Sequence, residues 1–341
     1  MYHNLCQLLL NMLCHLFVGM QQLLQTTKRS YIKHLHPECH VHHLEDTTRT
    51  MLFREFQGGK YVDHKHTVQY LRTCDTHIVM KTPHVRLHVI CPRSKQPPRL
   101  LLTRVMRRIE TLLKMYRCEK NLEFWLLPTS TRRTMPETVA TKITPYHING
   151  GFTYPQDNTV FIYRREEFPK VMLHETIHHL ELDTSAHWPW DRLKALYSAF
   201  GISKEGCSHV CTTDLNPNEA VVEAWATIYH LAFLNIEYGI PWKNVATIEI
   251  AWALRQAKAL LLKQAKMGGT WKEDTHAYSY VVLKSMLLWN MHAFITTPPS
   301  QLPRVFMDLV LSESRSYIQA LQSQPSHTTL NTLRMTAFGD L

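Results

Sequence analysis

Glycine is scarce in this sequence, with 11 residues in 341, and no fixed-period repeat is present. Both absences argue against glycine-rich linkers and repeat architectures. Charged residues make up only 19% of the chain and hydrophobic residues 45%, a composition that excludes a disordered chain and supplies a real core. The length allows one large domain or two modest ones.

Signatures of nucleic-acid-binding modules are also missing: the sequence has no recognition helix, no zinc finger and no aromatic RNA-binding motif. The net charge of +10 allows an acidic partner, which could be nucleic acid, an anionic membrane or an acidic protein. The basic residues are scattered, however, and their densest run, 99–117, keeps the apolar spacing of a helix. The charge therefore predicts a basic surface, and a nucleic-acid partner is allowed but not indicated.

The leucine-rich segment 5–24 lacks the features of a signal peptide, because no basic stretch precedes it and no A-x-A-like cleavage site follows. Gln7, Asn11 and His15 recur at every fourth position and draw a polar stripe along one helix face. The stripe favours an amphipathic packing helix. A membrane or signal segment, with membrane contact through residues 5–24, is the alternative.

The eight cysteines have irregular spacings, and a chain of this size does not need disulfides for stability. We therefore expect reduced thiols and an intracellular setting, in the cytoplasm or the nucleus.

The order of predicted elements indicates an α+β fold, with a small sheet and a motif-bearing helix followed by a mainly helical lobe. Pro92, Pro97 and Pro98 mark a break, which divides an N-terminal region of unknown role, 1–98, from a domain over 99–341. Periodicity predicts strands at 77–80, 85–89, 122–127 and 158–164, and helices at 99–117, 169–183, from 217, and at 241–266, 276–295 and 303–322.

The strongest motif is H-E-x-x-H, formed by His174, Glu175 and His178 in an apolar, helix-compatible stretch. On a helix, residues four apart share a face, so both imidazoles can reach one ion. Glu175 can reach a zinc-bound water, whose pKa the metal lowers towards neutrality, and can take its proton. Because the chain has 22 histidines, a chance match is a real alternative. The absence of glycine and proline inside the motif argues against it.

A catalytic zinc needs a third protein ligand, and the stretch 216–226 offers Glu219 and Glu223, one helical turn apart. One carboxylate can bind the metal while the other accepts the N–H of a ligand histidine. Both acids stand in an otherwise apolar segment, where burying them unpaired is costly. The pattern favours Glu219 as the ligand. Two alternatives stay open: Glu223 is the ligand, or neither glutamate is. Glu219 could instead belong to a capping box, because Asn216, Pro217 and Glu219 fit its N-cap, N1 and N3 positions.

H-E-x-x-H followed by N-E-x-x-x-[D/E] on a later helix resembles the gluzincin class of zinc metallopeptidases. The resemblance implies a zincin-like fold in which Glu219 binds zinc and Glu223 orients His174. Glu223 departs from the pattern, since aspartate is usual at that place.

The stretch 122–226, about a third of the chain, also resembles uncharacterised metalloprotease-like proteins encoded by large eukaryotic DNA viruses. The matching segments are 148–153, 161–167 and 170–174. This resemblance implies a location in the cytoplasm or nucleus of a host cell. It also implies that an edge strand, at 160–163 or 149–153, pairs with the substrate backbone.

Together these observations predict a metallopeptidase with Zn²⁺ as cofactor, a peptide or protein as substrate and Glu175 as general base. One alternative is a catalytically inactive zincin-fold protein that binds a partner through its basic surface. Another is a nucleic-acid-binding protein with a chance motif. The presence of Glu175 argues against the first alternative, because inactive zincins usually lose the base.

Two weaker hypotheses concern other residues. Five histidines and Cys39 lie between His34 and His43 and could bind a metal, although no standard zinc spacing fits them. Arg164 and Arg165 end the predicted strand before the motif helix and could favour acidic substrates.

Overall fold

The computed structural model describes residues 17–58, 62–138, 141–154, 156–182, 216–266, 273–312, 314–324 and 331–339. The chain divides into two compact units, which we call the sheet unit and the helical unit. The sheet unit comprises Thr26–Arg133, Pro145–Leu180 and Phe338–Leu341, and the helical unit comprises Met1–Gln25, Thr134–Thr144 and Glu181–Ala337.

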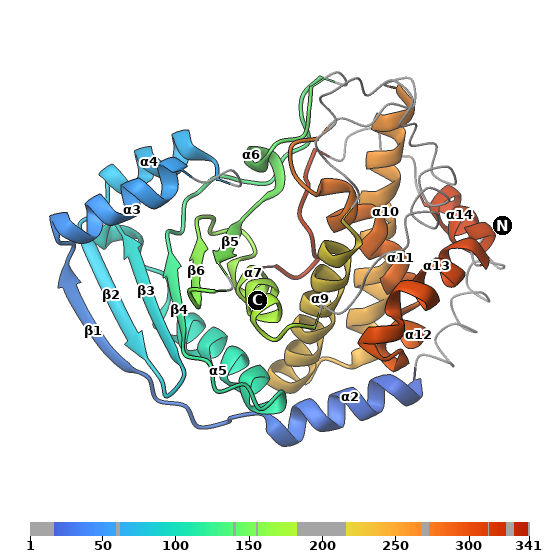
Figure 1. Ribbon diagram of the computed structural model, residues 1–341, viewed down its shortest axis with the longest axis horizontal. Helices are drawn as coiled ribbons and strands as arrows, with labels where there is room; N and C mark the ends of the chain where they lie inside the picture. The colour runs from blue at the N-terminus through green and yellow to red at the C-terminus, as the bar shows by residue number, and fades with distance from the viewer. Residues whose placement is uncertain are drawn as a thin grey trace. The chain divides into compact units, whose positions relative to one another are not determined.

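Six strands in the described part of the sheet unit form one mixed sheet in the order β1-β2-β3-β4-β6-β5 (Figure 1). The strands are β1 (Glu38–His43), β2 (Thr76–Lys81), β3 (Val85–Cys91), β4 (Leu122–Leu126), β5 (Gly151–Tyr154) and β6 (Thr159–Ile162). The pairs β1–β2, β2–β3 and β5–β6 are antiparallel, whereas β3–β4 and β4–β6 are parallel. The helix α5 (Arg99–Met115) makes the crossover between the parallel strands β3 and β4, as such a connection requires.

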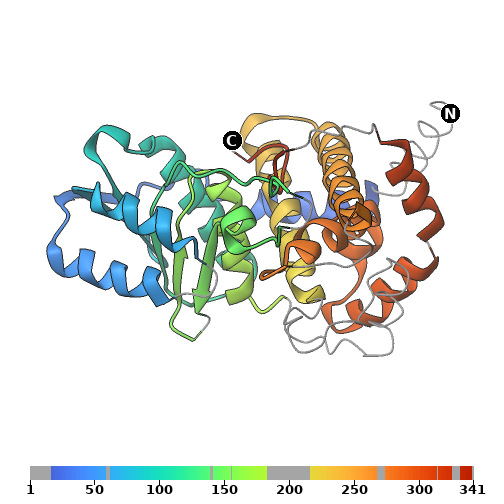
Figure 2. The same cartoon turned by 90° about the horizontal axis from the view of Figure 1, so that it is seen from above.

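Helices cover both faces of this sheet and pack on it through apolar side chains (Figures 1 and 2). On one face, α3 (Asp46–Gly58) and α4 (His64–Arg72) contribute Phe56 and Leu71 to a buried cluster with Trp125 and Phe161. The rings of Phe56 and Phe161 meet edge to face, 5.7 Å apart. On the other face, α5 packs beside α7 (Phe168–His179), and α7 contacts β5 and β6.

The helical unit contains the two longest described helices, α9 and α10. Its described elements are the start of α2 (Phe17–Ser30), α9 (Pro217–Tyr238), α10 (Trp242–Lys266), a π-helical segment (Ser279–Leu283), α11 (Lys284–Trp289), α12 (Met291–Thr296), α13 (Leu302–Ser312) and α14 (Ser314–Ser323). Helix α9 contacts α10, α11 and the π-helical segment. It is apolar on nearly every side and correspondingly buried, as expected of a central helix.

The mixed α+β class, with strands before the motif helix and helices after it, is as predicted. Three helices differ from prediction. Helix α7 ends at His179 rather than near 183, because Glu181 takes a left-handed conformation with φ 56°. The predicted helix 276–295 is interrupted at Asn290, whose backbone is not helical. The predicted helix 303–322 consists of α13 and α14.

Residues before α2 lie outside the described part, so the predicted helix 5–24 is seen only from Phe17 onwards. In that part Met20 is buried, and Gly19 lies against His292 and Thr296 of the same unit. No helix in the described residues is long and apolar enough to cross a membrane. The described cysteines, Cys39, Cys74, Cys91 and Cys118, are free thiols. The sheet draws strands from both sides of residue 98, and the proposed domain division there stays a prediction.

Candidate metal centre

Helix α7 carries the H-E-x-x-H motif and is held by its apolar residues. Met172, Leu173 and Ile177 are fully buried. The motif side chains are also largely inside: His174 is 7% exposed and Glu175 5% exposed. The rings of His174 and His178 lie 5.0 Å apart. An apolar environment of this kind makes ionisable groups costly unless they have partners.

A buried ion pair positions the start of α7. Glu167 is the N-cap residue, with φ 61°, and its carboxylate accepts a hydrogen bond from Arg133 Nη1 at 2.7 Å. Both side chains are almost completely inaccessible. The same guanidinium donates through Nε to the Ile148 carbonyl at 2.6 Å and through Nη1 to the Glu166 carbonyl at 3.0 Å. Arg133 therefore ties the segment before β5 to the start of the motif helix. Sequence reasoning missed this residue, which lies in a polar loop.

Arg164 is structural, and its predicted role in selecting acidic substrates is wrong. Its side chain is completely buried, and it donates to the backbone carbonyls of Asn149 and Tyr146 at 2.9 and 2.8 Å. These carbonyls belong to a connecting segment without strand partners, so the guanidinium satisfies them. A buried group that is occupied in this way cannot contact a substrate side chain.

The Gly150–Gly151 pair allows close packing. A Cβ atom on Gly150 would overlap the guanidinium of Arg133. On Gly151 it would lie 2.9 Å from the Phe161 carbonyl oxygen and 3.1 Å from Val171 of α7. Glycine thus lets β5 begin directly beneath the motif helix.

The last residue of α7 also contacts β5. The His179 ring shares a hydrogen bond of 2.7 Å with the Thr153 hydroxyl, which donates to the Thr159 carbonyl at 2.9 Å. The His179 Nε2 is therefore the donor. Burial, with smaller contributions from Lys120 and His178, lowers the pKa of His179 to about 4, so the ring is neutral near pH 7. Helix α7 is therefore held at both ends. Arg133 connects its start to the segment before β5, and the hydrogen bond between His179 and Thr153 connects its last residue to β5.

Helix α9 begins as predicted, with Asn216 as N-cap and Pro217 as first residue. The side chain of Asn216 makes no capping hydrogen bond. Glu219 stands in the first turn and is half-buried, and Glu223 one turn later is only 1% exposed. Sequence reasoning left Glu223 without a partner apart from a metal-site histidine. The structure gives it the ammonium of Lys284 at 3.8 Å, itself buried.

His174, His178 and Glu219 form a group that could hold a metal ion. One ligand atom from each residue lies within 4.8 Å of the others. An ion bonded at 2.0–2.2 Å to three such ligands would separate them by about 3–4 Å, so small side-chain adjustments suffice. Two imidazoles and one carboxylate are also a donor set of known catalytic zinc sites. Glu223 is not part of this group. The roles of Glu175 and Glu223 stay predictions.

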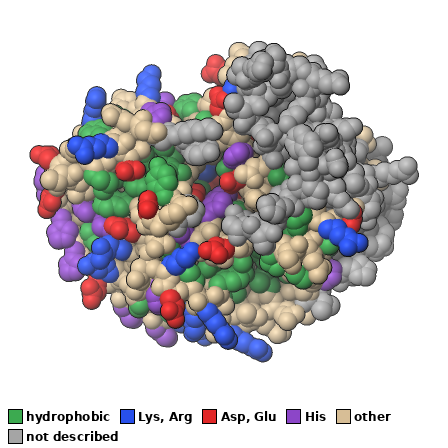
Figure 3. All heavy atoms as spheres, viewed as in Figure 1, with side chains coloured by type: hydrophobic (Ala, Val, Ile, Leu, Met, Phe, Trp, Pro, Cys, Tyr) green, Lys and Arg blue, Asp and Glu red, His purple; other side chains and the backbone are tan. Residues whose placement is uncertain are grey.

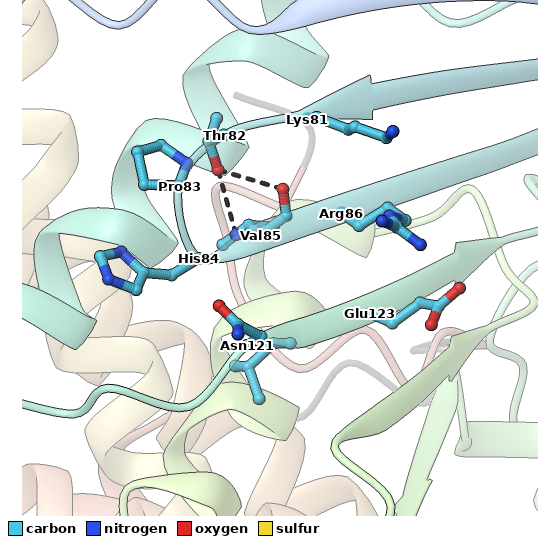
Figure 4. Close-up of a pocket in the computed structure, with 9 residues that line it drawn as sticks. Lys81, Thr82, Pro83, His84, Val85, Arg86, Asn121 and Glu123 are labelled. Carbon is cyan, nitrogen blue, oxygen red and sulfur yellow. Dashed lines mark hydrogen bonds between the residues drawn. The ribbon is translucent and has the colours of Figure 1, made fainter.

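A hollow of about 340 Å³ lies on the sheet unit (Figure 4). It is formed by the β2–β3 turn and the start of β4, and its lining includes Lys81, His84, Arg86, Asn121 and Glu123. The turn is held from inside by the carboxylate of Glu110, which accepts from the His84 backbone N–H at 2.9 Å. No residue of the H-E-x-x-H motif lines this hollow.

Comparison of the chain with protein-family models, with curated proteins and with solved structures finds no match. The resemblances to gluzincins and to viral metalloprotease-like proteins therefore rest on the motifs themselves. The site itself consists of two histidines and a glutamate that could hold a metal ion.

Proposed function

We propose that the chain is a zinc-dependent metallopeptidase of the gluzincin type, with its catalytic domain over 99–341. The observation that carries the proposal is the convergence of His174, His178 and Glu219 with a buried glutamate, Glu175, beside the first ligand. A purely structural zinc site normally has four protein ligands. Among the described residues, three ligands come together with an acid next to the first, the arrangement expected when one coordination position serves the reaction.

Zinc suits this donor set, and when bound it would supply Lewis acidity to a water molecule and to the scissile carbonyl. Glu175 would take one proton from the attacking water as its oxygen forms a bond with the carbonyl carbon. The same carboxylic acid would then deliver that proton to the nitrogen as the C–N bond breaks. The products are a carboxylic acid and an amine, Glu175 returns to its ionised form, and the acid then passes its proton to the amine or to solvent.

Glu223 is assigned a supporting role in this proposal. It lies one helical turn beyond Glu219 on α9 and is buried. A carboxylate at this place can accept the second ring N–H of a ligand histidine and fix its orientation, which strengthens metal binding. We assign His174 as that histidine, following the gluzincin pattern.

The substrate in this proposal is a peptide or protein in extended conformation. Strand β5 ends the sheet order and is paired on one side by β6. An extended peptide could add to its other side through backbone hydrogen bonds. Because β5 is fastened to α7 through Thr153 and His179, a strand bound there would have a defined position relative to the motif helix. An intracellular setting belongs to the same proposal.

The test begins with metal-free protein that is reloaded with Zn²⁺. Zinc per chain is measured by elemental analysis, and cleavage of a peptide library is followed by mass spectrometry. The matched variant is Glu175→Gln, which preserves shape and removes the base. We expect wild-type zinc content in the variant and cleavage reduced by about 10²–10⁴-fold, the usual contribution of a general base.

Other outcomes would point to the alternatives. Equal cleavage by wild type and Glu175→Gln would show that Glu175 is not the base. Zinc binding without cleavage of any peptide would favour an inactive zincin-fold binding protein. A wild-type chain that binds no zinc even after reconstitution would leave the motif as a coincidence in a histidine-rich sequence.

A further inference from the structure

A second group of histidines lies on one face of the sheet, distinct from the residues of α7. His40 and His42 are two residues apart on β1 and therefore share a face. His42 is paired directly with His77 of β2. His88 of β3 is paired with Val79, two residues from His77, so it lies on that face too. We call His40, His42, His77 and His88 the histidine face. Figure 3 shows histidine side chains gathered along the edge of the molecule where Figure 1 draws β1.

The two outer rings are exposed and the two inner rings are fixed. His40 and His42 are exposed on the edge strand. His88 is 8% exposed and stacks on the Trp125 ring at a centroid distance of 4.0 Å, inclined by 12°. His77 also stacks on Trp125, at 5.8 Å. The face therefore combines one rigidly placed imidazole, His77, with two imidazoles that can rotate in solvent.

A chain of polar contacts assigns the tautomer of His77. The Glu123 carboxylate lies 2.9 Å from His88 Nε2, and its interaction with this imidazole lowers the pKa of Glu123. An ionised carboxylate only accepts, so Nε2 of His88 carries the proton and its Nδ1 is an acceptor. His77 Nε2 lies 2.8 Å from that Nδ1 and must donate to it. The remaining nitrogen, Nδ1 of His77, then presents a lone pair.

This arrangement is the one that proteins use behind a metal-binding histidine. A ligand imidazole usually donates its second N–H to an acceptor that fixes its orientation. Here His88 is that acceptor for His77, and Glu123 in turn fixes His88. Figure 4 shows Glu123 on β4 beside Arg86 on the neighbouring β3. The pair is in register across the strands.

His40, His42 and His77 lie near one another on this face. The ring centroids of His40 and His42 are 6.1 Å apart, and those of His42 and His77 are 6.4 Å apart. Three imidazoles around one tetrahedral ion have centroids about 5 Å apart. The rings as they stand are too far apart to share an ion, and the exposed side chains of His40 and His42 would rotate inward to bind one.

We propose that His40, His42 and His77 form a second metal site, which takes a divalent transition-metal ion such as Zn²⁺ or Cu²⁺. Imidazole donors select such ions over Mg²⁺ and Ca²⁺, which prefer oxygen ligands. The ion would link the exposed edge strand β1 to β2, and its remaining coordination positions would face solvent. This site does not depend on the function proposed for α7.

The experiment is equilibrium dialysis of the metal-free full chain against Zn²⁺ at pH 7.5, with zinc per chain measured at each concentration. The variants His40→Ala and His42→Ala remove exposed ligands. The matched control is His43→Ala, because His43 is exposed on the same strand but paired with Thr76, and so points to the opposite face. A fourth variant, Glu123→Gln, leaves all histidines in place and removes the carboxylate that keeps the proton of His88 on Nε2.

We expect His40→Ala and His42→Ala each to weaken one zinc site by about tenfold or more, and Glu123→Gln to weaken it by about tenfold. His43→Ala should bind as wild type. The zinc held by α7 is identified separately, since His178→Ala should remove that ion and leave the histidine-face ion. Equal loss in His43→Ala and His42→Ala, or no effect of Glu123→Gln, would mean adventitious binding to exposed histidines and would overturn the proposal. So would the absence of any zinc site sensitive to His42.

Discussion

In the described part of the chain, histidines gather on α7 and on β1, and the two elements use different backbone periods. On α7, His174 and His178 are four residues apart, which is one helical turn. On β1, His40 and His42 are two residues apart, which is one strand repeat. Both spacings put two imidazoles on one face of their element. In each place a further element supplies the third donor, Glu219 on α9 or His77 on β2.

The difference lies in what surrounds the donors. His174 and Glu175 are buried on a helix that is fastened through Glu167 at its start and His179 at its end. His40 and His42 are exposed on an edge strand that ends the sheet order and is paired with β2 alone. A buried, fastened site can hold reacting groups in fixed positions, as catalysis requires. An exposed site on an edge can bind an ion but must order its own side chains to do so.

The largest expected effect concerns the buried ion pair at the start of α7. Arg133→Met would remove the cation that pairs with the buried Glu167 carboxylate. We expect the free energy of unfolding to fall by about 3–5 kcal/mol, because removing one member of a buried ion pair is strongly destabilising. Urea unfolding followed by circular dichroism measures this quantity.

The control for Arg133 is the double variant Arg133→Met/Glu167→Leu, which removes both charges and should recover much of the lost stability. The comparison between the two sites predicts more: zinc binding at His174 should weaken in Arg133→Met, while binding at the histidine face should not change. An equal loss of zinc at both sites would mean that the two sites do not differ in how they are supported.

The second effect separates the two glutamates of α9. Glu219→Ala should weaken zinc binding at the α7 site by at least about 100-fold, since it removes a ligand. Glu223→Gln keeps the side-chain shape and should weaken zinc by about 10–100-fold, the usual effect of removing a residue that orients a ligand. Equilibrium dialysis measures both.

Lys284→Met is the matched control for Glu223, because it removes the cation 3.8 Å away and leaves the carboxylate. If Glu223 orients His174, this variant should change zinc affinity much less than Glu223→Gln does. If the two variants have equal effects, Glu223 serves the ion pair with Lys284 and not the metal site. Zinc retained in Glu219→Ala but lost in Glu223→Gln would exchange the roles of the two glutamates.

Most of the sheet could be predicted from the sequence, and the exceptions have a physical reason. Strands β2, β3, β4 and β6 contain alternating or continuous apolar residues and lie where that pattern predicted. Strand β1 was missed because it is exposed on both faces and has no apolar pattern: five of its six residues are exposed and the sixth is half-buried. Its hydrogen bonds to β2 define it, and no local signal reveals such pairing.

The residues of the candidate sites also divide into those that the sequence pattern revealed and those that it did not. His174 and His178 could be found because both stand on one helix, and Glu219 was suggested by its motif on a later one. The contacts of Arg133 with Glu167 and of Glu223 with Lys284 join residues 34 and 61 positions apart, and no periodicity connects them. Arg164 was misinterpreted because arginine at the end of a strand is normally exposed. The histidine face became visible only with the register of β1, β2 and β3.

The smallest expected effect tests the inner part of the histidine face through pH. The pKa of His77 is about 4 in the folded chain and about 6.5 in an unfolded one. Between these values the unfolded chain binds a proton that the folded chain does not, so stability falls as the pH falls from 6.5 towards 4. Above pH 6.5 the ring is neutral in both states and contributes no pH dependence.

Because the ring is partly exposed, we expect a contribution of about 1 kcal/mol between pH 7.5 and pH 5. Urea unfolding of wild type and of His77→Gln, both with EDTA, measures it. The variant loses the hydrogen bond to His88 at every pH, which shifts its curve by a constant amount. The informative quantity is the slope, and wild type should lose about 1 kcal/mol more than the variant over this range. Parallel curves would mean that His77 is protonated as easily in the folded chain as in the unfolded one. In that case the tautomer assigned through Glu123 and His88 would not hold the ring ready for a metal.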